Sequence, residues 1–231
     1  MDVARDLPVS EDIVTVVAQT QTRGRGRFDR VWISPPQGGL YLTVRMPWRN
    51  RPLVQAPLVS LGCALALGRL CRELGIEGTT LKWPNDLLLS GKKAAGILAE
   101  MIHPQGTTTL LVGVGIDVSL PESSLLAVGQ PTTTLSVAAG IPLECEPILH
   151  RFLAIWSEVD KILEAKGFPA LVDEFRTFSD AQGRTFRLAG TGPIQRIRVR
   201  CILEDGALEV ELLSTGEIRQ LHGGELLADA P

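Results

Sequence analysis

A run of four short apolar segments between residues 80 and 118 most strongly limits the fold of this chain. Strand-like composition recurs in residues 80–83, 86–89, 95–102 and 108–118. Residues 89–92 carry a Ser-Gly pair suited to a hairpin turn, and residues 103–106 form the next connection. The spacing therefore predicts a meander on one sheet.

The segments around this meander alternate between strand and helix patterns. Two further strands are predicted at residues 13–18 and 39–46. Residues 57–74 place leucines at helical spacing and end at Gly75, a suitable residue for a helix C-terminus. The other predicted helices are residues 134–139, 146–166 and 168–178, with a loop at residues 121–131.

After Asp180 the pattern changes to short alternating strands separated by turns that contain glycine. These strands are predicted at residues 184–188, 195–203, 207–213 and 218–221. A separate small β-barrel is the architecture that this pattern favours.

Composition and charge limit the class of protein. The 231 residues are 45% apolar and 21% charged, which suits one large domain or one with a small appendage. A net charge of −3 argues against a surface that binds nucleic acid throughout. Four scattered cysteines predict reduced thiols rather than a zinc site. The N-terminus lacks the apolar core of a signal peptide, and the apolar runs are interrupted before the length of a membrane span, so we expect a cytoplasmic protein.

An Arg- and Gly-rich loop lies between the first two predicted strands. Gly24 and Gly26 allow backbone N–H groups to approach an anion, and Arg25, Arg27 and Arg30 supply forked donors for phosphate or carboxylate oxygens. The alternative is a solvated or RNA-binding Arg-Gly segment, although such segments are usually repeated. On these residues alone the two interpretations are equally favoured.

A second motif is Lys-Trp-Pro-Asn-Asp at residues 82–86. Pro84 suits a turn between two strands, and Lys82 and Lys93 could approach each other across the resulting hairpin. The alternative is an ordinary turn with exposed lysines. Trp83 favours a structured site over an exposed turn, because a large buried ring needs packing and a partner for its N–H.

Together these motifs resemble the biotin protein ligases, the biotin-[acetyl-CoA-carboxylase] ligases. The family's GRGRxGRxW loop matches residues 24–32, its KWPND motif residues 82–86 and its KxAGIL motif residues 93–98. Residues 111–118 are similar to its GIGINVN strand, and residues 223–225 to its closing Gly-Gly-Glu. The order and spacing also match over nearly the whole chain.

The resemblance implies an α+β fold. A class II aminoacyl-tRNA-synthetase-like catalytic domain, a mixed sheet flanked by helices, would occupy residues 1–181. An SH3-like β-barrel would occupy residues 182–231. The implied reaction joins biotin and ATP, with Mg²⁺, into biotinyl-5′-AMP and then biotinylates one lysine of a biotin carboxyl carrier protein.

The resemblance also assigns residues to the site. Arg27, Lys93, Lys82 and Asp86 match positions tied to adenylation, and Lys93 would contact the biotin carboxylate and the phosphoryl group. The implied biotin and adenylate contacts are Gln21, Thr22, Gly24, Arg25, Arg27, Arg30, Trp32, Lys93, Gly96, Ile97, Gly113, Gly115 and Asp117. Metal ligands are not predicted, since no spacing links the three histidines.

The chain departs from the family pattern in three places. Asp29 stands where the loop normally has glycine, and could pair with Arg30. Asp117 stands where asparagine is usual. The family's Ser-Thr-Asn segment before the loop is missing, so we expect a chain shortened at its N-terminus, without a DNA-binding domain.

Two alternative functions stay open at this stage. One is a catalytically impaired protein that binds biotin or the adenylate, left after loss of the Ser-Thr-Asn segment. The other is a lipoate-type ligase, which is disfavoured because that family's Gly-Gly-Gly and His pattern is lacking. By analogy, a sheet edge would serve either homodimerisation or carrier docking.

Overall fold

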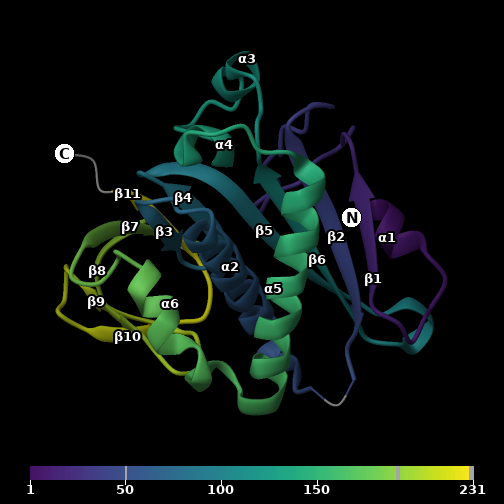
Figure 1. Cartoon of the computed structure of the whole chain (residues 1–231). Coiled ribbons are helices and arrows are strands. Elements are labelled where there is room, and N and C mark those ends of the chain that lie inside the picture. Colours follow the sequence, from purple (N-terminus) through teal and green to yellow (C-terminus); the bar gives the residue numbers. More distant parts are fainter. Residues whose placement is uncertain (50, 191–192, 229–231) are drawn as a thin grey trace.

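A six-stranded sheet forms the centre of the molecule, in the order β1-β2-β6-β5-β4-β3 (Figure 1). The structure is a computed structural model and describes residues 1–49, 51–190 and 193–228. The strands are β1 (Val14–Ala18), β2 (Gly39–Pro47), β3 (Thr79–Lys82), β4 (Asp86–Leu89), β5 (Lys92–Ile102) and β6 (Thr109–Asp117). The meander β3 to β6 is confirmed, and β2 pairs with its last strand.

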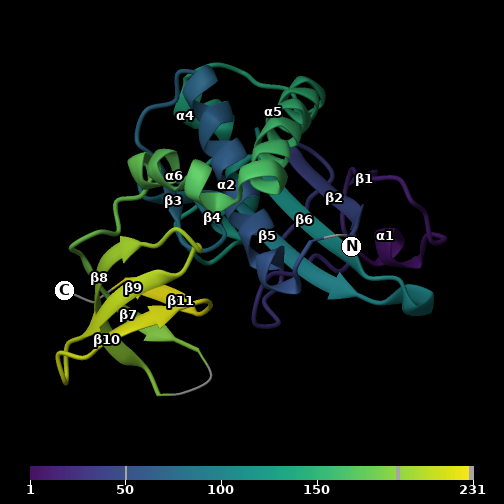
Figure 2. The ribbon, with the colours of Figure 1, turned by 90° about the horizontal axis from the view of Figure 1, so that it is seen from below.

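Two long helices cover one face of this sheet (Figures 1 and 2). They are α2 (Ala56–Glu73) and α5 (Cys145–Lys166), which pack against each other. Apolar side chains at helical spacing, including Leu65, Leu67 and Phe152, are fully buried between the helices and the sheet. The helix α2 ends at Glu73 with Leu74 as its C-cap residue, and Gly75 follows as predicted, with a φ of +68° in the left-handed region that glycine adopts without strain.

The apolar segment that contains α2 is longer than the sequence analysis expected, which found no apolar run as long as a membrane span. Within the helical segment Leu53–Glu73, an 18-residue window has a mean hydropathy of 1.5, so the segment is long and apolar enough to cross a membrane by length and composition. However, 61% of this window is buried inside the fold, as in the core helix of a soluble protein. This helix is therefore weak evidence for a membrane span.

A second sheet follows at the C-terminal end, in the order β10-β9-β8-β7-β11. Its strands are β7 (Thr185–Ala189), β8 (Gln195–Ile202), β9 (Leu208–Leu212), β10 (Ile218–Leu221) and β11 (Glu225–Ala228). Alternate side chains of β8 and β9, such as Val199 and Val210, are buried on one face. The SH3-like barrel and its boundary at residue 182 stay predictions.

The second sheet lies beside the first (Figure 2), and hydrogen bonds join it to the β3–β4 turn and to a helix. The buried Trp83 Nε1 donates a hydrogen bond to the Gly206 carbonyl, 3.1 Å away, in the turn between β8 and β9. Arg176 Nε, in the helix α6 (Val172–Phe178), donates to the Ile202 carbonyl at 3.0 Å. The hydrogen-bond partner expected for Trp83 is therefore supplied by the second sheet.

Several details correct the sequence prediction. The six-stranded sheet was expected to be mixed, but every pairing between its named strands is antiparallel. The expected loop at residues 121–131 contains the helix α3 (Glu122–Leu126). The expected helix at residues 168–178 is broken at Leu171 between a 3-10 turn, Phe168–Ala170, and α6. The strand β11 and the helix α1 (Asp2–Asp6) were not predicted. The remaining α-helix is α4 (Leu135–Ala139), and further 3-10 turns lie at Leu53–Gln55 and Pro104–Gly106.

Candidate active site

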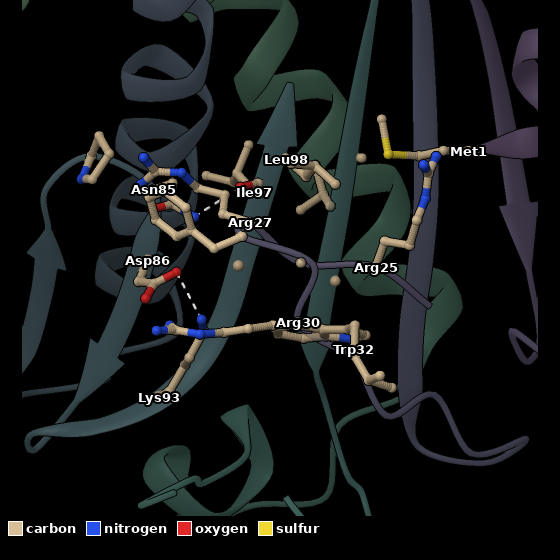
Figure 3. Close-up of a pocket in the computed structure, with 18 of the residues that line it drawn as sticks. Met1, Arg25, Arg27, Arg30, Trp32, Asn85, Asp86, Lys93, Ile97 and Leu98 are labelled. Carbon is tan, nitrogen blue, oxygen red and sulfur yellow. Dashed lines mark hydrogen bonds and ion pairs between the residues drawn. The ribbon is translucent and has the colours of Figure 1, made fainter. Parts of the chain in front are cut away.

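A pocket opens where the loop of residues 21–32, here the Arg-Gly loop, crosses β5, β6 and the β3–β4 turn (Figure 3). It is lined by most of the predicted site residues, namely Gln21, Arg25, Arg27, Arg30, Trp32, Lys82, Asp86, Lys93, Gly96, Ile97, Gly113 and Gly115. Thr22, Gly24 and Asp117 do not line it. Segments more than 60 residues apart in the chain thus meet at one place.

The Arg-Gly loop folds as a small hairpin. Gly26 N–H donates to the Arg30 carbonyl at 2.7 Å, and Trp32 N–H donates to the Gly24 carbonyl at 2.9 Å. At the tip, Phe28 and Asp29 have φ of 56° and 57°, in the left-handed region. Glycine adopts this region most readily and aspartate tolerates it, which explains why a glycine suits the position of Asp29.

Glycines form the floor of the pocket beneath Trp32. Gly96 of β5 and Gly115 of β6 are cross-strand partners, and the Trp32 ring lies against both. A Cβ on Gly115 would lie 2.5 Å from Trp32 Cε2, and one on Gly96 would lie 2.8 Å from Trp32 Cζ3. Any side chain at either position would therefore displace the ring.

Lys93 and Asp86 form a half-buried ion pair in the pocket wall. Lys93 Nζ lies 2.8 Å from Asp86 Oδ1, with side-chain exposures of 19% and 17%. This oxygen is buried and the contact lacks hydrogen-bond geometry, so the attraction is that of an ion pair alone. The same Nζ lies 5.4 Å from the centre of the Trp32 ring, within cation–π range.

Arg27 is held between two parts of the chain. Its Nη1 donates to Asn85 Oδ1 and its Nη2 donates to the Gly224 carbonyl, each at 3.0 Å. Burial lowers the pKa of Arg27, while the carboxylates of Asp86 and Glu225 act in the opposite direction. The guanidinium keeps its charge, since its ordinary pKa lies far above neutral pH.

Arg30 is fixed by the second sheet. Its two terminal nitrogens donate to the Glu225 carboxylate at 2.5 and 2.7 Å, a bidentate pair. This hydrogen bonding raises the pKa of Arg30. Arg30 therefore pairs with Glu225 and not with Asp29.

Arg25 points away from Arg27 and Arg30, toward the N-terminal helix (Figure 3). It lies 3.1 Å from Asp2 Oδ1 and 3.4 Å from Glu100 Oε2. Gly24 serves the hairpin, because a Cβ there would lie 2.2 Å from the Trp32 carbonyl oxygen. Thr22 is exposed to solvent.

Asp117 lies at the end of β6, outside the pocket lining, and its residue is only 4% exposed. Burial raises the pKa of this carboxyl to about 7, while the positive charge of Lys93 acts to lower it. This carboxyl therefore keeps its proton to a higher pH than an ordinary aspartate does.

Three residues at the site escaped the sequence prediction. Asn85, Gly224 and Glu225 contact the loop arginines. The resemblance of residues 223–225 to the family's closing motif was the one signal for the last two. Their contact with the loop depends on segments nearly 200 residues apart, which local patterns do not reveal.

The described residues contain no group of three or more His, Cys, Asp or Glu side chains placed to hold a metal ion. Asp86 is the carboxylate that lines the pocket beside Lys93. Mg²⁺ in nucleotide sites commonly takes one or two carboxylates and otherwise phosphate oxygens and waters. The residues present therefore fit a magnesium ion that arrives with a nucleotide.

The sequence profile of the biotin/lipoate A/B protein ligase family matches residues 7–117. The bifunctional ligase/repressor BirA of Escherichia coli is 32% identical over 216 residues, 91% of this chain. Residues 7–117 therefore form a domain of the biotin/lipoate A/B protein ligase family. The chain spans 64% of the length of that BirA.

Solved and curated biotin protein ligases are similar to this chain in fold and in sequence. A biotin protein ligase from Aquifex aeolicus, solved in complex with biotin and ATP, superposes with a TM-score of 0.79. The two are 27% identical, and the match covers 97% of this chain and 92% of the other. The biotin-[acetyl-CoA-carboxylase] ligase of Mycobacterium tuberculosis is 36% identical over 131 residues, 55% of this chain and 48% of its own length. The predicted α+β fold and the resemblance to biotin protein ligases are therefore confirmed.

Proposed function

We propose that this chain is a biotin-[acetyl-CoA-carboxylase] ligase. It activates biotin with ATP to biotinyl-5′-AMP and transfers the biotinyl group to one lysine of a biotin carboxyl carrier protein. The pocket supports this assignment, as does the likeness to a ligase solved with biotin and ATP.

The observation that carries the proposal is the convergence of three cations on a glycine-floored pocket. Lys82, Arg27 and Lys93 come from three separate segments and line the same space. Adenylation brings a carboxylate against an anionic triphosphate, so the site must offset their repulsion. Preorganised cations lower the energy of the charge that develops as pyrophosphate leaves.

The proposed reaction has two steps. A biotin carboxylate oxygen attacks the α-phosphorus of ATP, the bond to the β-phosphate oxygen breaks, and pyrophosphate leaves. The amine of the carrier lysine then attacks the biotinyl carbonyl carbon, loses a proton and expels AMP. Because the nucleophiles belong to the substrates, this protein needs no nucleophilic side chain.

The geometry suggests how the residues divide this work. Lys93, beside Asp86 and the Trp32 face, is placed for the carboxylate and α-phosphoryl oxygens. The Arg27 guanidinium has N–H groups beyond the two held by Asn85 and Gly224, and these can donate to the ligand. Bound magnesium would neutralise phosphate charge, with Asp86 as its protein contact.

Finer points of the assignment are part of the same proposal. We infer a cytoplasmic protein whose second sheet is an SH3-like barrel, with residues 1–181 as the catalytic domain. The partners would be a carrier protein and, at a sheet edge, a second copy of the chain. A binding protein without catalysis is less well supported, because Arg27, Lys82, Asp86 and Lys93 all line the pocket.

A carrier-labelling assay tests the proposed function. The purified chain is incubated with biotin, magnesium ATP and a biotin carboxyl carrier domain, and the carrier mass is followed. We expect a gain of one biotinyl group that requires ATP. Lipoate with a lipoyl carrier domain serves as the matched control, and labelling of that carrier alone would instead identify a lipoate ligase.

A further inference from the structure

We propose that Asn85 is the positioning residue for Arg27, which it holds in the orientation needed for adenylation. This inference rests on the proposed function, since it extends the role assigned to Arg27. Asn85 lies in the turn between β3 and β4 and lines the pocket (Figure 3).

Three hydrogen bonds tie Asn85 to both the loop and the sheet. Arg27 Nη1 donates to Asn85 Oδ1 at 3.0 Å. Asn85 Nδ2 donates to the Ile97 carbonyl at 2.9 Å, and the Ile97 N–H donates to the Asn85 carbonyl at 2.9 Å. The side-chain amide is thus locked onto β5, with its oxygen turned toward the guanidinium.

The chemistry of the two neighbours defines the residue required between them. An arginine can only donate and a backbone carbonyl can only accept. The side chain between Arg27 and Ile97 must therefore accept at one end and donate at the other. Asparagine does both over a short reach, whereas aspartate cannot donate and alanine does neither.

The arrangement leaves the guanidinium ready for a ligand. Of the five N–H groups of Arg27, one is taken by Asn85 and one by the Gly224 carbonyl. The plane of the group is fixed by these two contacts before any ligand binds. Donors already oriented in this way stabilise developing charge more effectively than donors that must first become ordered.

A double-mutant cycle tests the coupling. Biotin-dependent exchange of pyrophosphate into ATP is measured for the wild type, Asn85→Ala, Arg27→Ala and the double variant. Asn85→Ala should lower kcat about tenfold or more in the wild type, the size of a lost hydrogen bond to a charged group. In the Arg27→Ala background the same change should have no further effect. Equal fold losses in both backgrounds would overturn the proposal, because Asn85 would then act independently of Arg27.

A conservative variant and a control variant distinguish loss of Arg27 positioning from a general loss of folding. Asn85→Asp keeps an acceptor for Arg27 but places a carboxylate against the Ile97 carbonyl, so its kcat should lie between those of the wild type and Asn85→Ala. Gln220→Ala changes an exposed amide in the second sheet and should match the wild type. Unfolding temperatures of all variants identify any that fail to fold.

An NMR measurement that does not depend on catalysis tests the role of Asn85 separately from the proposed ligase function. In protein labelled with ¹⁵N-arginine, the Arg27 Nε resonance is assigned by its loss in Arg27→Lys. It should shift or broaden in Asn85→Ala and stay unchanged in Gln220→Ala. An unchanged resonance in Asn85→Ala would contradict the positioning role. A wild type without exchange activity would instead contradict the proposed function, and the resonance would still test Asn85.

Discussion

At the scale of single residues, the proposed function assigns the central role to Lys93, whose charge lies in the pocket wall beside Asp86 and the Trp32 ring. Replacing Lys93 with alanine removes the cation placed for the carboxylate and the phosphoryl group. We expect adenylation to fall by about a hundredfold or more, as for the loss of an oxyanion stabiliser. Pyrophosphate exchange measures this rate.

The neighbouring Lys92 supplies the matched control, because its side chain is exposed. Lys92→Ala removes the same charge one position away and should keep the wild-type rate. If both variants lost activity equally, overall charge rather than the position of Lys93 would be responsible.

Asp117 predicts a dependence of stability on pH. Its pKa is about 7 in the folded protein and 3.8 in the reference state, so folding favours the protonated carboxyl. This contribution is complete below the unfolded pKa and is lost as pH rises through the folded pKa. Relative to Asp117→Asn, the wild type should lose roughly 2–4 kcal/mol between pH 4 and pH 8.

Urea unfolding of both proteins at pH 4, 6 and 8 measures this difference. Because asparagine does not titrate, the difference in pH dependence between the two proteins should come from Asp117. Parallel stability curves for the two proteins would show that Asp117 ionises normally in the fold.

At the scale of elements, the pairing of β5 with β6 forms the surface on which Trp32 of the Arg-Gly loop packs. In Gly115→Ala the new Cβ would overlap the Trp32 ring, so the loop should lift from the sheet. We expect trypsin to cleave the arginines of the loop faster and adenylation to fall at least about tenfold.

Gly190→Ala is the control for this substitution, because a Cβ there meets no atom of the described residues within 4 Å. It should leave both the cleavage rate and the activity unchanged. Slow cleavage of Gly115→Ala, as in the wild type, would contradict the role of the glycine floor.

Elements with a strong apolar period were predictable from the sequence. The bounds of β4 and β10 matched their predictions, and α2 and α5 differed by a residue at most. The helices α1 and α3 have five residues each and no side-chain cap, and they were missed. The equally short α4 was predicted; it begins after Thr134, whose side chain accepts from the Val137 N–H, and ends before Gly140. The strand β11 was missed because its order depends on pairing with β7, a tertiary contact.

The residues of the candidate site were likewise predictable where a local motif marked them and were missed where their role depends on tertiary contacts. Gly96 and Gly115 were found through motifs that lie within single strands. Asn85 and Glu225 were not, because their roles follow from contacts with the distant Arg-Gly loop. Asp117 was singled out as a site residue from its motif, yet its side chain lies outside the pocket lining.

At the scale of the whole molecule, Trp83 couples the two sheets. Its buried Nε1 donates to Gly206, so Trp83→Phe leaves a carbonyl without its partner. We expect the free energy of unfolding to fall by about 1–2 kcal/mol. Chemical denaturation measures this loss.

Trp48 offers a matched control, since its Nε1 is buried and has no hydrogen-bond partner among the residues that the structure describes. Trp48→Phe removes an indole N–H that gains nothing in the fold and should cost less than Trp83→Phe. Equal losses would show that ring volume, not the hydrogen bond to Gly206, determines the effect.

The most direct test of the assigned chemistry is exchange of labelled pyrophosphate into ATP by the purified wild-type chain, with magnesium and without any carrier. The pocket that joins Arg27 and Lys93 over the glycine floor predicts exchange that requires biotin and disappears in Lys93→Ala. Exchange supported by lipoate but not by biotin, or no exchange from a folded protein, would contradict the assignment.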